Sequence, residues 1–188
     1  MRYPNGINKN KTNLITHSNR GMNLENDINI TNEYYRNNNI AVIYKKPTSI
    51  TIKKVDYSNN DMICEAYFKT PSTTDYNGIY KGYYIDFEAK ETRNKTNFPL
   101  SNIHNHQIEH LKKIHEHGGI GFLIVKFTLL NKIYYLKIED LINYINNNKQ
   151  KSIPIAFFDK FGKIIEEKYN PRIDYLKYVE EELNERNI

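Results

Sequence analysis

Most of the chain from residue 21 onwards carries hydrophobic residues at regular spacings. Alternating or β-branched runs predict strands at 40–46, 49–56, 62–69, 83–90 and 132–138. Pro47 and the turn formers Asn77-Gly78 and Gly82 mark breaks between these runs. The continuous apolar run 120–127 predicts a strand covered on both faces. Hydrophobic residues at helical spacing predict helices within 21–37, 101–119 and 139–147 and from 172 onwards. The apolar run at 153–158 predicts a short strand. Because each amphipathic helix must cover a sheet face, this order predicts an α/β fold with a central sheet flanked by helices.

One predicted strand carries charge where a strand face is usually apolar. In "TTDYNGIYKGYYIDFEAKE", residues 73–91, Asp86, Glu88 and Lys90 alternate with Ile85, Phe87 and Ala89. Side chains two apart share a face, so the apolar set faces a core and the charged set faces a cleft. Tyr83 falls on the apolar side, which favours core packing over an exposed role.

Asp75 lies thirteen residues before Glu88, with the turn-forming pair Asn77-Gly78 between them. A chain reversal there would bring the two carboxylates together, and their repulsion is costly unless they share a cation. Oxygen ligands without cysteine favour Mg²⁺, or Mn²⁺, over zinc. Such an ion assists phosphodiester hydrolysis, and Lys90 beside it can stabilise negative charge.

Two other interpretations of the charged residues compete with this one. An acid-x-Lys triplet alone is weak evidence for an active site, because the chain contains a second one, Glu166-Glu167-Lys168. The competing interpretation is an exposed strand face on which Glu88 and Lys90 form a surface ion pair. His106 and His110, four apart on a predicted helix, have the spacing of a zinc chelate, but no third ligand of suitable type is fixed nearby.

Charge is unevenly distributed along the 188 residues, whose formal net charge is +5. Residues 1–20 contain four Lys or Arg and no acidic residue, which predicts a flexible basic arm that attracts a polyanion, followed by one domain at 21–188. The single Cys64 excludes an internal disulfide, and its apolar surroundings predict a buried side chain. No secretory signal or membrane-spanning run is visible, so we expect a cytoplasmic protein without a membrane partner.

The pattern Asp75…Glu88-x-Lys90 resembles that of the PD-(D/E)xK nuclease superfamily. Longer blocks are more specific: "MRYPNG", "SNRGMNLE", "FKTPSTTDYNGIYKGYYIDFEAKET", "NKTNFPLSNIHNHQIEHL" and "PRIDYL" are similar to the RecU family, the Holliday-junction resolvases of Gram-positive bacteria. The resemblance runs from Arg2 to about Tyr175. It implies a restriction-endonuclease-like mixed sheet, a β-hairpin stalk at about 68–83, and a Mg²⁺-dependent endonuclease that resolves four-way junctions by paired symmetric nicks in recombination and repair.

The resemblance also implies roles for single residues and for partners. The family's magnesium ligands correspond to Thr73, Asp75, Glu88 and Gln107, its transition-state lysine corresponds to Lys90, and Glu25 matches a helix acid near such sites. It further implies a homodimer and contacts of the basic arm with DNA and with the RecA recombinase. The residues that we expect to contact DNA are Arg20, Lys45, Lys46, Tyr80 and Lys81.

Two alternatives of different classes stay open at this point. One is a PD-(D/E)xK endonuclease with another DNA target, and the other is a non-catalytic protein that binds branched DNA. A binding protein would have no chemical need for Asp75, Glu88 and Lys90 together, and their joint presence favours an enzyme.

Overall fold

The structure, a computed structural model, describes residues 23–59, 61–68 and 73–186. Its main feature is a six-stranded sheet in the order β1-β4-β5-β7-β8-β10. All neighbouring strands are antiparallel except β5 and β7, which are parallel because α2 connects them. The helices are α1 (Leu24–Asn37), η1 (Leu100–Asn102), α2 (Asn105–Glu116), α3 (Ile138–Asn147), α4 (Ile155–Phe161) and α5 (Leu176–Arg186). The sheet strands are β1 (Val42–Lys45), β4 (Tyr76–Tyr80), β5 (Tyr83–Thr92), β7 (Ile120–Phe127), β8 (Lys132–Lys137) and β10 (Lys163–Ile165).

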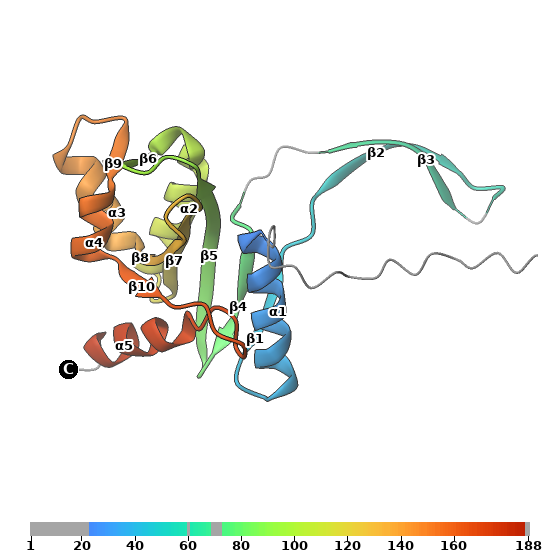
Figure 1. Cartoon of the computed structure of the whole chain (residues 1–188). Helices are drawn as coiled ribbons and strands as arrows, with labels where there is room; N and C mark the ends of the chain where they lie inside the picture. The colour runs from blue at the N-terminus through green and yellow to red at the C-terminus, as the bar shows by residue number, and fades with distance from the viewer. Residues whose placement is uncertain (1–22, 60, 69–72, 187–188) are drawn as a thin grey trace, which may run out of the picture.

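Helices cover both faces of this sheet, as the sequence predicted for an α/β fold (Figure 1). On one face, α1 and α5 pack on a core that includes Ile85, Phe87 and Phe122. On the other face, α2, α3 and α4 pack on a core that includes Leu123 and Val125. Strand β7 is buried along its whole length, which confirms the prediction of a central strand covered on both faces.

A two-stranded hairpin of β2 (Ile50–Asp56) and β3 (Met62–Phe68) projects away from this body (Figure 1). The prediction of a protruding hairpin was right, but its placement at 68–83 was wrong. Strand β4 lies inside the six-stranded sheet between β1 and β5, so residues 76–83 cannot project. The side chain of Cys64 is exposed on this hairpin, which corrects the prediction that it is buried.

The reversal between β4 and β5 does not use the Asn77-Gly78 pair. Both residues lie within β4, and a Cβ atom at Gly78 would come 2.1 Å from the carbonyl oxygen of Val42 on β1. Glycine is therefore needed there for close strand packing. The turn is made by Lys81 and Gly82, whose φ angles of 50° and 84° suit a two-residue hairpin loop.

Two smaller predictions near the C-terminus also need correction. Residues 153–158 do not form one strand: β9 (Ser152–Pro154) pairs with β6 (Asn97–Pro99), and α4 follows it directly. The last helix begins at Leu176 instead of near 172, because Ile173 and Tyr175 are fully buried in the core before the helix starts.

Candidate active site

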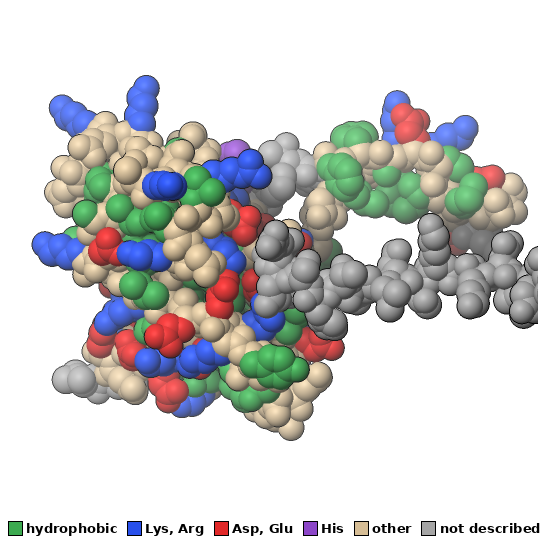
Figure 2. Space-filling view, in the orientation of Figure 1, with side chains coloured by type: hydrophobic (Ala, Val, Ile, Leu, Met, Phe, Trp, Pro, Cys, Tyr) green, Lys and Arg blue, Asp and Glu red, His purple; other side chains and the backbone are tan. Residues whose placement is uncertain are grey.

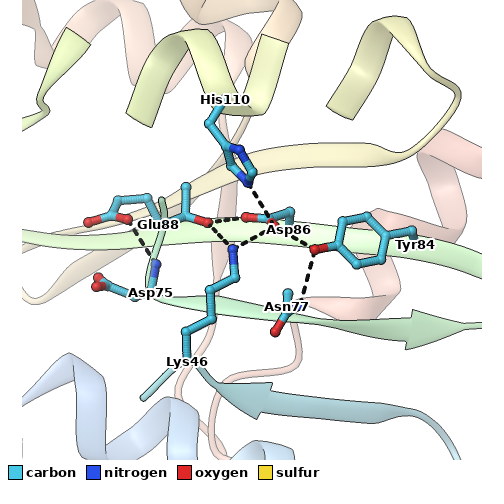
Figure 3. Close-up of polar contacts among 8 residues, drawn as sticks. Lys46, Asp75, Asn77, Tyr84, Asp86, Glu88 and His110 are labelled. Carbon is cyan, nitrogen blue, oxygen red and sulfur yellow. Dashed lines mark hydrogen bonds and ion pairs between the residues drawn. The ribbon is translucent and has the colours of Figure 1, made fainter. Parts of the chain in front are cut away.

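Asp75 and Glu88 meet at the end of the β4–β5 hairpin. Tyr76 pairs with Phe87 in the antiparallel register, so Asp75, one residue before β4, lies beside Glu88. The backbone N–H of Asp75 donates a hydrogen bond of 3.0 Å to Oε2 of Glu88 (Figure 3). The sequence thus predicted the meeting of these two residues, although it placed the reversal at the wrong pair.

Glu88 occupies an environment that disfavours its charge. Its side chain is fully buried. Burial, followed by the negative charge of Asp75, raises the pKa of Glu88 to about 7, and the nearby ammonium of Lys90 opposes this shift. Lys90 Nζ lies 2.5 Å from Glu88 Oε1, but among the described residues no hydrogen bond of regular geometry reaches that oxygen. A further cation beside Glu88 and Asp75 would offset the free-energy cost of burying the charged carboxylate.

Gln107 and Thr73, the other two predicted metal ligands, lie on segments other than β5. Gln107 is buried in the first turn of α2, where its Oε1 accepts a hydrogen bond of 3.0 Å from the backbone N–H of His104. His110, one turn further along the same helix face, reaches Asp86 on β5, so this face of α2 is turned towards the charged side of β5. Thr73 is half-buried two residues before Asp75.

A pocket of about 230 Å³ is lined by Asp75, Lys90 and the start of α1, whereas Glu88, Thr73 and Gln107 are not part of its lining. Glu25 also lines the pocket, and its carboxylate forms an ion pair of 2.5 Å with Lys45. Glu91, which the sequence reasoning did not single out, fixes the helix here because its Oε1 accepts a hydrogen bond of 2.7 Å from the Leu24 N–H. The pocket therefore brings together three of the residues that we predicted to be catalytic.

Asp86 is the centre of a polar network that the sequence reasoning missed (Figure 3). This fully buried carboxylate is contacted by Lys46, Tyr84 and His110 at 2.7, 2.9 and 3.2 Å, all on Oδ2. The Thr74 hydroxyl donates a hydrogen bond to its Oδ1. The alternation of charge along β5 was the only sequence signal for Asp86, and it could not indicate these partners.

The predicted DNA contacts fall in several different environments. Arg20 and the basic arm 1–20 lie outside the described residues. Tyr80 is buried (6% exposed) and its hydroxyl donates to Glu180, so its burial contradicts the predicted contact with DNA. Tyr83, by contrast, is 36% exposed, which overturns the predicted core packing of its side chain. Lys81 is exposed and pairs with Glu180.

The histidine pair does not form a chelate. His110 contacts Asp86, whereas the ring of His106 stacks on His104 with centroids 5.3 Å apart. Within the described part of the chain, no group of three His, Cys, Asp or Glu side chains could hold a metal ion. The predicted magnesium set differs from such a group, because it combines two carboxylates with the hydroxyl of Thr73 and the amide of Gln107.

Comparison with known proteins gives close relatives along nearly the whole chain. A family model described as recombination protein U (RecU) matches residues 19–181. A protein of Bacillus cytotoxicus named "Holliday junction resolvase RecU" is 50% identical over 193 residues, which cover 96% of each chain. A protein of the same name from Bacillus anthracis is 49% identical with the same coverage. Among solved structures, Archaeoglobus fulgidus Hjc, a Holliday junction resolvase, matches 70% of this chain and 93% of its own with 9% identity and a TM-score of 0.39.

Proposed function

This chain belongs to the RecU family, and from that premise we propose that it is a Mg²⁺-dependent endonuclease that resolves Holliday junctions by paired nicks during recombination and repair. The observation that carries the proposal is the meeting of Asp75 and Glu88 on paired segments, with the Lys90 ammonium beside them. Two neighbouring carboxylates with a lysine beside them are the groups that metal-assisted phosphodiester hydrolysis requires.

The predicted ligand residues have the side-chain chemistry that suits a divalent ion with oxygen ligands. Asp75 and Glu88 would supply carboxylate oxygens, and Thr73 and Gln107 would supply neutral ones. The raised pKa of Glu88, which burial and the neighbouring Asp75 cause, supports this assignment, because a shared cation would stabilise both carboxylates in the charged form. When bound, Mg²⁺ would activate a water molecule and polarise the scissile phosphate.

Lys90 and Glu25 would act from the walls of the pocket. The Lys90 side chain is 23% exposed, so its ammonium can leave Glu88 partly and face a phosphate in the pocket. There it would stabilise the negative charge that develops on the phosphate oxygens as the ester bond breaks. Glu25 lines the same pocket and pairs with Lys45, and this pair would orient the DNA strand.

The projecting hairpin β2–β3 is suited to contact branched DNA. Hydrophobic side chains lie along it together with Lys, Asp and Glu side chains (Figure 2). Tyr67 and Phe68 are 57% and 77% exposed, and exposed aromatic rings can stack on unpaired bases. Lys45, Lys81 and the basic arm with Arg20 would add further phosphate contacts.

A homodimer is the assembly that this function favours. Two symmetric cuts in a four-way junction need two active sites related by a twofold axis. Because a resolvase acts on chromosomal DNA, we further propose that the protein acts in the cytoplasm and that its basic arm contacts RecA. Among residues 23–59, 61–68 and 73–186, no helix is long and apolar enough to cross a membrane.

The decisive experiment compares four-way, three-way and linear duplex substrates at increasing Mg²⁺ concentrations. We expect nicks at symmetric positions of the four-way junction, lost in EDTA, with little cutting of the linear duplex. Equal cutting of all three substrates would refute junction selectivity, and cutting in EDTA would refute metal dependence.

A further inference from the structure

Lys46 is directed into the protein, unlike its neighbour Lys45. Its side chain is only 19% exposed, and its ammonium donates hydrogen bonds of 2.7 Å to Asp86 Oδ2 and 2.9 Å to Thr74 Oγ1. Lys45, by contrast, is 39% exposed and pairs with the half-exposed Glu25. The two adjacent lysines therefore meet different partners, although the sequence suggested the same role for both.

The backbone of Lys46 holds the same segment as its side chain. Its N–H donates a hydrogen bond of 2.7 Å to the carbonyl oxygen of Asp75, which extends the β1–β4 pairing by one step. Thr74 lies between these two contacts and is itself bonded to Asp86. Lys46 thus binds residues 74–75 by two hydrogen bonds, one from its ammonium to the Thr74 hydroxyl and one from its backbone N–H to the Asp75 carbonyl oxygen.

The network around Lys46 joins every element that carries a proposed metal ligand. Asp86 lies two residues before Glu88 on the same side of β5. Through His110, Asp86 also contacts α2, the helix of Gln107 (Figure 3). A displaced Lys46 would leave the fully buried Asp86 with less compensation for its charge, which is strongly unfavourable.

We propose that Lys46 is a positioning residue that holds the segment of Thr73 and Asp75 against β5 in metal-binding geometry, and that it does not bind DNA phosphate. This inference rests on the proposed function, because it assigns Lys46 a role towards the same magnesium ion. The partners that surround a metal's ligands commonly change its affinity by about 10- to 100-fold when they are removed.

The experiment compares Lys46→Met with Lys45→Met, and uses Lys163→Met, on the far edge strand, as the control. Lys163 pairs only loosely with Glu181, at 3.7 Å. Two quantities are measured for each folded variant. The first is the Mg²⁺ concentration that gives half of the maximal thermal stabilisation, which requires no catalysis. The second is the slope of log K against log salt for four-way junction binding in EDTA.

We expect Lys46→Met to raise the Mg²⁺ midpoint by at least about tenfold and to leave the salt slope unchanged. Lys45→Met should reduce the slope by about 0.9, as the loss of one phosphate contact does, and Lys163→Met should change neither quantity. An unchanged Mg²⁺ midpoint in Lys46→Met would overturn the inference. So would a reduced slope in that variant, with or without a change in the midpoint.

A second variant keeps the test decisive if Lys46→Met does not fold. Thr74→Val removes the hydroxyl that joins Lys46 to Asp86 but keeps a similar volume, and it should raise the Mg²⁺ midpoint in the same direction. An unchanged midpoint in Thr74→Val would count against the network. If the wild type itself gains no stability from Mg²⁺ and cuts no junction, the proposed function fails. If the wild type responds and both variants match it, only this inference fails.

Discussion

Replacing Glu88 with glutamine should stabilise the metal-free protein above neutral pH while abolishing cleavage. The physical reason is that the buried carboxylate beside Asp75 is a poor place for negative charge, since its pKa rises from 4.5 to about 7. A raised carboxyl pKa means that the folded protein binds the proton more tightly than the unfolded chain does. The resulting stability is complete below about pH 4.5 and is lost as pH rises through about 7.

The size of the effect follows from the shift. About 2.5 pKa units at ~1.4 kcal/mol each give roughly 3 kcal/mol for ionising Glu88 in the folded state. Glutamine removes that charge and can keep the hydrogen bond from the Asp75 N–H, because its amide oxygen accepts as well. The attraction of Lys90 already lowers this pKa, so the loss of that ion pair is contained in the shift and is not subtracted again. We therefore expect a net gain of roughly 3 kcal/mol at pH 8.

The assay is urea unfolding in EDTA at pH 5 and pH 8 for wild type and Glu88→Gln. The difference in unfolding free energy between the two proteins is the quantity of interest, because every other titratable group is common to both. We expect this difference to shift in favour of the variant by roughly 2 to 3 kcal/mol between pH 5 and pH 8. Saturating Mg²⁺ should stabilise the wild type and have little effect on the variant. A variant that is less stable than wild type at pH 8 in EDTA would refute the reasoning.

Three further predictions address the site, the sheet and the hairpin. Asp75→Ala should abolish cleavage of a synthetic four-way junction while binding stays within about tenfold of wild type, and cutting at the wild-type rate with Mg²⁺ would remove Asp75 from the site. Gly78→Ala should lower the urea midpoint and destabilise the fold by about 2 kcal/mol or more, because its Cβ would collide with the Val42 carbonyl oxygen; an unchanged midpoint would contradict the close β1–β4 packing. Replacing hairpin residues 50–68 with a short Gly-Ser linker should weaken binding to four-way junctions more than to linear duplex, as measured by gel shift, and an equal loss for both would mean that the hairpin does not read branching.

The sequence predicted those parts of the protein whose interactions are local or strongly periodic. The apolar run 120–127 identified the central strand, and the thirteen-residue spacing of Asp75 and Glu88 identified their meeting. The hairpin turn was missed because Asn77-Gly78 is the stronger turn signal. That signal was overridden by β1, which packs too closely against Gly78 for any side chain.

Interactions between distant parts of the chain could not be predicted in this way. Asp86 meets Lys46 and His110 across 40 and 24 residues, so no local pattern indicates that its charge is compensated. Tyr80 was predicted to face DNA because neighbouring residues are aromatic and basic. It is buried because α5 supplies Glu180 from 100 residues further along the chain.

The most direct test of the account is a crystal structure of the protein with Mn²⁺, examined by anomalous scattering. Manganese takes the same oxygen ligands as magnesium, and its position can be identified from its own signal. We predict a peak within about 2.3 Å of carboxylate oxygens from both Asp75 and Glu88. A saturating Mn²⁺ concentration that gives a peak only elsewhere, such as at His106, or no peak between these two carboxylates, would contradict the claim that they share a metal ion.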